Sequence, residues 1–199
     1  MRRVAGADEA GRGCLAGPLV AASVCLDLDA MSPRDRRGLG FLNDSKRVPA
    51  ETRERLHEII LRVADQVVVV LAPPQTIDRD GLHVTNLRLL RRALSGITVD
   101  VGERLVDGFS LGPEAPPHRR VVGGDRTSAA IAAASIVAKV SRDRLMAGPM
   151  ARAYPEFGFD QHVGYSTPEH REAIVASGPS PLHRMSFRSA AYAAAPSSA

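Results

Sequence analysis

The sequence has no tryptophan, and aromatic residues make up only 4% of its 199 residues. Hydrophobic residues as a whole reach 44%, which is enough for a sizeable core. That core must therefore consist mainly of Val, Leu, Ile and Ala. The length fits a compact domain with a small C-terminal extension.

Cysteine is also scarce, since Cys14 and Cys25 are the only two. They show neither CxxC spacing nor a zinc pattern with histidine, and two thiols cannot form a disulfide framework. We expect both to be small buried residues in a reducing compartment.

Long apolar runs are absent, and none approaches the roughly 18 residues of a membrane span. The N-terminus begins with basic residues, but Asp8 and Glu9 arrive too early for the apolar core of a signal peptide. We therefore expect a cytoplasmic protein that does not bind membranes. The formal charge of +4 and pI of about 9.6 favour a polyanionic partner without requiring one.

Strand and helix patterns alternate along the chain, which predicts an α/β fold with one sheet that is partly antiparallel and partly parallel. Proline and glycine punctuation predicts surface loops at 27–40 and 112–118. We expect a catalytic domain at 1–145, a helical C-terminal extension at 146–192 and a disordered tail at 193–199. The predicted strands are 4–7, 19–26, 66–71, 104–106 and 120–122, and the predicted helices are 49–63, 82–94 and 128–146.

Four acids share one setting, at or just after the end of a predicted strand and beside glycine: Asp8, Glu9, Asp107 and Asp125. Ligand sites of open α/β sheets gather at the carboxyl ends of strands, so one sheet would cluster these acids. Adjacent strand residues point to opposite faces. Asp8 and Glu9 therefore reach one site only if the strand stops or bends at Glu9.

Oxygen-only ligands suit Mg²⁺ or Mn²⁺ better than zinc. A pair of such ions about 4 Å apart can activate water and stabilise the leaving oxygen of a phosphodiester. The alternative is that the acids form turns and caps. Asp125 could cap the helix that follows it, and Asp107 with Gly108 could form a turn.

The predicted helix at 128–146 carries a stripe of small and polar residues that could line a phosphate track. The alternative is a solvated face on which Asp143 pairs with Lys139. The stripe consists of Ser128, Ala132, Ser135, Lys139 and Arg142.

Three loop features could contact nucleic acid. Gly11 and Gly13 flank Arg12, and such glycines let a backbone approach a phosphate or sugar closely. Lys46 follows Asn-Asp-Ser, where it could bind phosphate or belong to a plain turn. Tyr165, between glycine and serine, could stack on a sugar or base or pack in the core.

The stretch from Asp8 to Pro18 resembles the opening signature of ribonuclease HII. Later stretches are similar to further blocks of that family, and they run in family order over residues 4 to 188, nearly the whole chain. These stretches are Asn43–Lys46, Val106–Gly108, Gly124–Asp125, Ser135–Asp143, Gly164–Thr167 and Pro181–Phe187.

The resemblance implies an RNase H-like mixed sheet flanked by helices, with a small helical C-terminal extension. It implies endonucleolytic hydrolysis of the RNA strand of RNA/DNA hybrids and a cut 5′ of ribonucleotides embedded in duplex DNA. The cofactor would be Mn²⁺ or Mg²⁺, and the products would carry 3′-hydroxyl and 5′-phosphate ends.

The resemblance also implies residue roles. The acids Asp8, Glu9, Asp107 and Asp125 would bind metal, and Asp8 would bridge both ions. Gly11, Arg12 and Gly13 would read the 2′-hydroxyl chiefly through backbone groups, Tyr165 would stack on the sugar of the following deoxynucleotide, and Lys46, Ser135 and Lys139 would contact phosphates.

One departure is Met185, which stands where the family commonly has a basic residue, and the C-terminus has no recognisable peptide for binding a replication clamp. We expect a monomer. Three other hypotheses remain at this point: a DNA-only nuclease of related fold, a hybrid-binding protein without catalysis, and an unrelated basic α/β domain.

Overall fold

The computed structural model describes residues 2–40, 42 and 48–194. The chain forms two compact units that interleave along the sequence. The helix α5 (Ala129–Leu145) belongs to the first unit up to Val140 and to the second from Ser141, and the expected domain boundary at residue 145 stays a prediction. The second unit also takes in two earlier segments. The first unit is Met1–Ala10, Val20–Leu71 and Asn86–Val140, and the second is Gly11–Leu19, Ala72–Thr85 and Ser141–Ala199.

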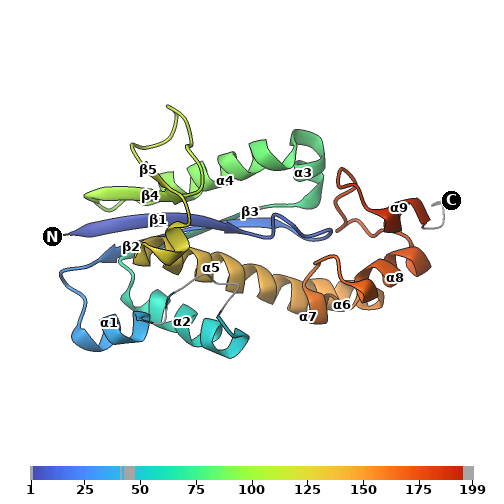
Figure 1. Cartoon of the computed structure of the whole chain (residues 1–199), viewed down its shortest axis with the longest axis horizontal. Coiled ribbons are helices and arrows are strands. Elements are labelled where there is room, and N and C mark those ends of the chain that lie inside the picture. The colour runs from blue at the N-terminus through green and yellow to red at the C-terminus, as the bar shows by residue number, and fades with distance from the viewer. Residues whose placement is uncertain (1, 41, 43–47, 195–199) are drawn as a thin grey trace. The chain divides into compact units, whose positions relative to one another are not determined.

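A mixed sheet of five strands, in the part of the chain that is described, confirms the predicted fold class (Figure 1). The order is β3-β2-β1-β4-β5. Strand β1 is antiparallel to β2 and parallel to β4, which is parallel to β5. The strands are β1 (Arg3–Ala10), β2 (Leu19–Asp27), β3 (Gln66–Ala72), β4 (Glu103–Asp107) and β5 (Arg119–Val121).

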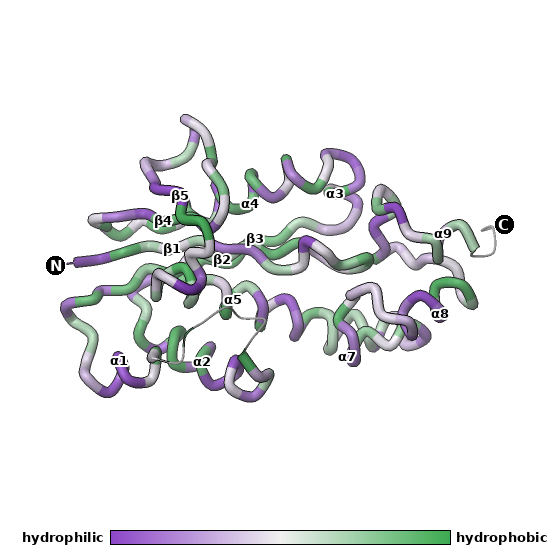
Figure 2. The backbone as a smooth tube through the Cα atoms, in the orientation of Figure 1, coloured by the Kyte–Doolittle hydropathy of each residue, from purple (hydrophilic) through white to green (hydrophobic). Residues whose placement is uncertain are grey.

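Helices cover both faces of this sheet. In Figure 1, α4 (Leu82–Ser95) lies on one side, while α2 (Ala50–Val63) and α5 lie on the other. Figure 2 shows hydrophilic and hydrophobic residues alternating along α4, as the helical spacing predicts. The core between α5, α2 and β2 consists of Ala, Val, Leu and Ile side chains.

Helix α5 approaches the sheet very closely at Gly6 of β1. A Cβ atom at Gly6 would lie 2.2 Å from the backbone carbon of Ala130. Glycine on the strand and alanine on the helix therefore allow the two backbones to approach each other. Residues 130–140 of α5 are all buried, so the alternative of a solvated face on this helix is wrong.

Two further expectations are corrected. The segment 27–40 is not wholly a loop, because α1 (Pro33–Leu39) begins after Ser32, whose side chain accepts a hydrogen bond from the Asp35 amide. Strand β1 does not stop at Glu9, since Glu9 pairs with Ala21 of β2 and the ladder continues to Ala10.

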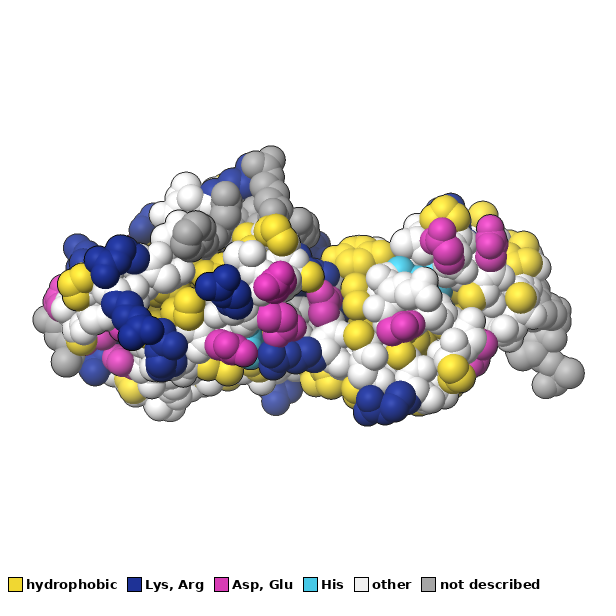
Figure 3. Space-filling model, turned by 90° about the horizontal axis from the view of Figure 1, so that it is seen from below, with side chains coloured by type: hydrophobic (Ala, Val, Ile, Leu, Met, Phe, Trp, Pro, Cys, Tyr) yellow, Lys and Arg dark blue, Asp and Glu magenta, His cyan; other side chains and the backbone are white. Residues whose placement is uncertain are grey.

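The first unit exposes arginines on α1 and α2. Figure 3 shows Lys and Arg side chains on the face seen from below, with acidic side chains among them. The exposed arginines of these two helices are Arg34, Arg36, Arg37, Arg55 and Arg62.

The second unit is helical and has its own small core around Phe157 and Phe159. Both cysteines of the chain are buried free thiols, as expected. Within the described residues, no helix is long and apolar enough to cross a membrane. The remaining helices are α3 (Pro74–Asp80), α6 (Ala151–Ala153), α7 (Phe159–His162), α8 (Pro168–Ser177) and α9 (Ala190–Ala194), with a π-helical turn at Met146–Met150 and 3₁₀ turns at Gly124–Arg126 and Pro155–Phe157.

Candidate active site

Asp8 and Asp107 lie side by side near the carboxyl ends of neighbouring parallel strands. Ala7 of β1 pairs with Val106 of β4, and each aspartate is the next residue of its strand. Asp8 is only 6% exposed. The parallel pairing thus brings together two carboxylates that are 99 positions apart in the sequence.

Asp8 lies in an environment that opposes its negative charge. Burial raises the pKa of the Asp8 carboxyl well above its usual range, and the charges of Glu9 and Asp107 raise it further. A side-chain hydrogen bond with Ser135 of α5 and the Glu9 amide, which donates to Asp8 Oδ1 at 2.7 Å, act in the opposite direction. A cation beside Asp8 would relieve the repulsion between these carboxylates.

Asp107 links β4 to the turn that carries Asp125. Its Oδ1 accepts a hydrogen bond of 2.7 Å from the amide of Gly124, the residue before Asp125. Asp125 lies in the 3₁₀ turn Gly124–Arg126, whereas α5 begins at Ala129.

The alternative that Asp125 caps α5 does not hold. The hydroxyl of Ser128 accepts from the Ile131 amide at 3.5 Å, a long hydrogen bond, so Ser128 occupies the capping position at the start of the helix.

The side chain of Glu9 leaves β1 on the face of the sheet opposite to that of Asp8. Asp8 is hydrogen-bonded to Ser135 on the α5 side, and the following residue of a regular strand points to the opposite face. Among the described residues, no group of three or more His, Cys, Asp or Glu side chains is arranged to hold a metal ion. The oxygen donors of the four acids fit a hard divalent cation, and so does the repulsion of Asp8 by Glu9 and Asp107, but the acids do not form a closed coordination shell here.

Helix α5 presents Ser135 and Lys139 as buried residues, 5% and 8% exposed. Arg142, from the same predicted stripe, is wholly buried. It donates to the carbonyl oxygens of Pro18, Ala16 and Val163 at 3.0, 2.9 and 2.8 Å. The prediction that Arg142 belongs to a phosphate track is therefore wrong.

The predicted recognition loop lies in the second unit. Gly11 is buried with φ +92°, and its Cβ would lie 2.2 Å from Arg142 Nε. Arg12 is half-buried, and its carbonyl oxygen accepts from Arg184 Nη1 at 3.2 Å. Gly13 is exposed, and a Cβ added there would meet no atom within 4 Å. Only Gly11 is thus required by packing within the chain.

Tyr165 also belongs to the second unit and is partly buried. Burial raises the pKa of its phenol, and the neighbouring Cys14 contributes to that rise. The Tyr165 carbonyl oxygen lies 2.8 Å from Nδ1 of His170. Lys46 lies outside the described residues.

Sequence reasoning missed Arg184, which is 0% exposed. Its guanidinium donates to the carbonyl oxygens of Gly17 and Pro18 as well as Arg12. Only its place in the stretch Pro181–Phe187 marked it, and nothing local reveals partners 166 to 172 positions away.

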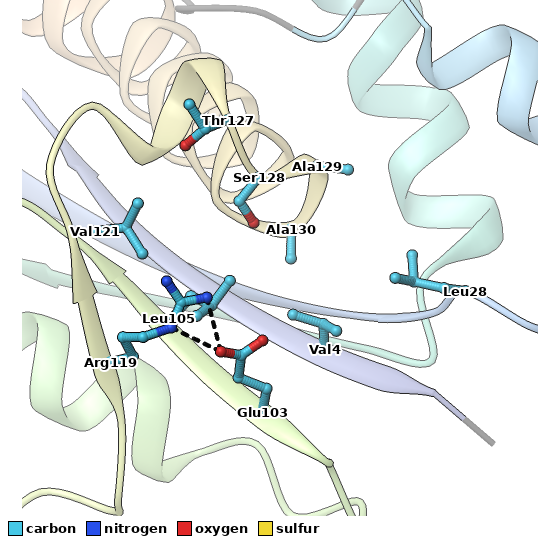
Figure 4. A pocket seen from close by; sticks show the side chains of 10 residues that line it. All are labelled: Val4, Leu28, Glu103, Leu105, Arg119, Val121, Thr127, Ser128, Ala129 and Ala130. Atoms are coloured by element: carbon cyan, nitrogen blue, oxygen red, sulfur yellow. Dashed lines mark hydrogen bonds and ion pairs between the residues drawn. The ribbon is translucent and has the colours of Figure 1, made fainter.

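A cavity of about 360 Å³ in the first unit is not the site of the acids. Its lining includes Val4 and Glu103, near the amino ends of β1 and β4, whereas Asp8 and Asp107 lie near the carboxyl ends. Figure 4 shows Glu103 facing Arg119, whose Nε donates to it at 2.8 Å.

A mixed sheet flanked by helices, with acids at the ends of its central parallel strands, defines an RNase H-like α/β protein. The profile of the family described as Ribonuclease HII matches residues 5–190. The chain belongs to the ribonuclease HII family. This is a family of metal-dependent endonucleases with ribonuclease H activity, so the chain is an enzyme of that class.

Relatives support this membership over most of their length. The chain is 47% identical to a ribonuclease HII of Mycobacterium avium over 184 residues, which cover 92% of this chain and 77% of that protein. It is also 47% identical over 184 residues to a ribonuclease HII of Mycobacteroides abscessus, covering 92% of this chain and 76% of that one.

Solved structures show the same fold. The ribonuclease H2 of Pyrococcus horikoshii superposes with a TM-score of 0.79 at 26% identity, covering 96% of this chain and 95% of that one. The structure of a PCNA:RNase HII complex from Archaeoglobus fulgidus gives a TM-score of 0.75 at 27% identity, covering 93% and 95%. A ribonuclease HIII solved with Mn²⁺, at 20% identity, shares the fold with a TM-score of 0.74 and coverage of 96% and 68%.

Proposed function

We propose that this protein hydrolyses the RNA strand of RNA/DNA hybrids and cuts duplex DNA on the 5′ side of an embedded ribonucleotide, leaving 3′-hydroxyl and 5′-phosphate ends. The observation that carries the proposal is the pairing of β1 with β4, which sets Asp8 beside Asp107 near the strand ends. Membership of the ribonuclease HII family supports the same reaction class.

The carboxylates are proposed to hold divalent cations, Mn²⁺ or Mg²⁺. Asp8, Glu9, Asp107 and Asp125 would be the ligands, with Asp8 as the shared one. When bound, such cations lower the pKa of water and stabilise a departing phosphodiester oxygen. Ser135 orients the Asp8 carboxylate through its hydrogen bond, and Asp107 holds the turn of Asp125 through the Gly124 amide.

The Gly11–Gly13 loop and Tyr165 are proposed to recognise the substrate. Gly13 is exposed with open space at its Cβ position, which lets backbone groups approach a sugar closely. The 2′-hydroxyl is the feature that separates a ribonucleotide from its deoxy neighbours. Tyr165 would stack on the sugar of the following deoxynucleotide, and Lys46, Ser135 and Lys139 would contact phosphates.

Exposed arginines on α2 and the basic pI agree with a polyanionic substrate. Neutralised phosphates make such binding fall steeply with salt. We therefore expect the affinity for duplexes to decrease as the salt concentration rises.

Cleavage of a labelled DNA duplex with one ribonucleotide tests the proposal. The reactions contain Mn²⁺, Mg²⁺ or chelator, and an all-DNA duplex of the same sequence is the control. We expect metal-dependent cutting 5′ of the ribonucleotide and an intact all-DNA duplex. Ligation of the products identifies their ends.

Two results would contradict the proposal. Cutting of the all-DNA duplex would favour a DNA nuclease of related fold. Binding of hybrids by folded protein without cleavage, under either metal, would favour a binding protein.

With Asp8→Asn, we expect cleavage to fall at least about a hundredfold, the scale for removing one electrostatic group from an active site.

A further inference from the structure

Two buried arginines surround the backbone of residues 11–18. Arg142, at the end of α5, donates to the carbonyl oxygens of Ala16 and Pro18, and the Cβ position of Gly11 faces its Nε at 2.2 Å. Arg184, from the C-terminal segment, donates to the carbonyl oxygens of Arg12, Gly17 and Pro18. All these residues belong to the second unit.

The arrangement is unusual because neither guanidinium depends on a carboxylate for these contacts. Both side chains are 0% exposed, and the acceptors of their hydrogen bonds are backbone carbonyl oxygens. Burial and the positive charge of Arg142 lower the pKa of Arg184 to about 10. Burying two cations close together costs free energy that neutral donors would avoid.

The geometry of the guanidinium group explains why arginine occupies these positions despite the cost of burial. Arginine has five N–H donors in a fixed plane, so it can hold several carbonyl groups in one fixed relative orientation. Arg142 and Arg184 together donate hydrogen bonds to carbonyl oxygens at both ends of the segment 11–18, which has little regular structure and lies between β1 and β2. The carbonyl oxygens of residues 12 and 16–18 are thereby turned toward the interior of the unit.

We propose that Arg142 and Arg184 are positioning residues that fix the Gly11–Gly13 backbone in the conformation that discriminates a ribonucleotide from a deoxynucleotide. They act through the loop and do not touch the substrate. The inference rests on the proposed function, because it assigns the loop the recognition of the 2′-hydroxyl. A preorganised loop loses less conformational freedom on binding than a mobile one.

Lysine replacements test this inference. Arg184→Lys and Arg142→Lys keep the charge but remove the planar fork, and Arg36→Lys is the matched control. Arg36 also donates to two backbone carbonyl oxygens, those of Leu28 and Met31, on an exposed segment of the first unit.

The readout is the ratio of two dissociation constants, for the all-DNA duplex and for the same duplex with one ribonucleotide. Each variant is combined with Asp125→Asn to suppress turnover, and the folded fraction is isolated by gel filtration. We expect the ratio to fall about tenfold or more with Arg184→Lys or Arg142→Lys, the scale of one lost charged hydrogen bond. With Arg36→Lys the ratio should stay unchanged.

A merely structural role predicts a different result. Partial unfolding lowers the active fraction for both duplexes alike and leaves the ratio unchanged, so an unchanged ratio overturns the inference. Failure of both lysine variants to fold would also overturn it in favour of a purely structural role. If the protein with intact arginines does not prefer the ribonucleotide duplex, the proposed function fails before the arginines are tested.

Discussion

At the scale of single residues, Gly11 and Gly13 are glycines for different physical reasons. Gly11 has a positive φ of +92° and packs against the Arg142 guanidinium. Gly13 is exposed, has no atom within 4 Å of its Cβ position and has no positive φ. A side chain at Gly11 is therefore excluded by the fold, whereas a side chain at Gly13 would be excluded only by a ligand.

We predict opposite effects of two alanine substitutions. Gly11→Ala should destabilise the protein by about 1–3 kcal/mol, because it forces strain in a left-handed conformation and displaces Arg142. Gly13→Ala should change the free energy of unfolding by less than about 0.5 kcal/mol, as surface substitutions usually do. It should nevertheless lower cleavage of the single-ribonucleotide duplex more than about tenfold.

Urea unfolding and cleavage kinetics on both variants measure these effects. The assignment of Gly13 to close substrate approach fails if Gly13→Ala cleaves like the unmodified protein. A large loss of stability in Gly13→Ala would show instead that packing requires this glycine.

Asp8 gives a second prediction at this scale. Its folded pKa lies above the unfolded one, so ionised Asp8 lowers stability as pH rises above about 4. In chelator at pH 8, Asp8→Asn should therefore melt at the same or a higher temperature than the unmodified protein. Differential scanning calorimetry of both proteins at pH 5 and pH 8 measures this. A melting temperature of Asp8→Asn below that of the unmodified protein at pH 8 would contradict the prediction.

At the scale of elements, the sequence predicted what depends on local pattern. All the expected strands and helices are present, since branched runs and helical spacing are local signals. Helix α1 was missed because proline and charge at 33–37 imitate a loop, although Ser32 and Asp35 form a helix start. The strand end predicted at Ala7 was wrong, because pairing with β2 continues to Ala10 and outweighs the glycines that follow.

The site was predictable only in part. The acids lie beside glycines at strand ends, and that pattern identified Asp8 and Asp107 as neighbours. The buried arginines could not be predicted, because Arg142 Nε reaches Pro18 across 124 positions. In the sequence, a helical stripe of Ser, Lys and Arg has the same pattern whether it faces solvent or a loop packed against the helix.

The second unit contains a chain of buried histidines with one consistent set of proton positions. The Ser180 amide donates to His183 Nδ1 at 2.9 Å, so the His183 proton is on Nε2. His183 Nε2 then donates to His170 Nε2 at 3.1 Å, and His170 Nδ1 donates to the Tyr165 carbonyl oxygen at 2.8 Å. With both imidazoles neutral, each ring nitrogen of His170 and His183 therefore takes part in a hydrogen bond.

We predict that this chain makes the second unit sensitive to acid. Burial lowers the pKa of His170 and of His183 to about 4, from about 6.5 in an unfolded chain. Between these pH values the unfolded state binds more protons than the folded state. The contribution of the two neutral histidines to the free energy of unfolding is therefore full above pH 6.5 and decreases as pH falls toward 4. The loss should be about 2 kcal/mol for each histidine between pH 7 and pH 4.5.

Amide hydrogen exchange of residues 157–183 as a function of pH, corrected for intrinsic rates, measures the loss. His170→Gln should weaken the pH dependence, while His83→Gln, at an exposed position on α4, should leave it unchanged. Equal protection at pH 4.5 and pH 7 would exclude the histidine chain as an acid-sensitive element.

At the scale of the whole molecule, Asp8 and Asp107 come from separated parts of the chain that the first unit brings together, and Glu9 and Asp125 are proposed to join them. Asp8 and Glu9 lie on β1, Asp107 ends β4, and Asp125 lies in the turn before α5. Folding therefore accumulates negative charge in one region, and burial strengthens the repulsion. A cation that binds there favours the folded state over the unfolded one, so metal binding and stability are coupled.

We predict that Mn²⁺ raises the melting temperature. At a concentration 100 times its dissociation constant it should add about 2.7 kcal/mol, which corresponds to roughly 5–10 °C for a chain of this size. Asp8→Asn and Asp107→Asn should lose most of this increase, whereas Glu58→Gln, at an exposed acid of α2, should keep it. Thermal unfolding with Mn²⁺ and with chelator measures the effect. An equal increase in Asp8→Asn would place the stabilising cation elsewhere and contradict the assignment of these acids as its ligands.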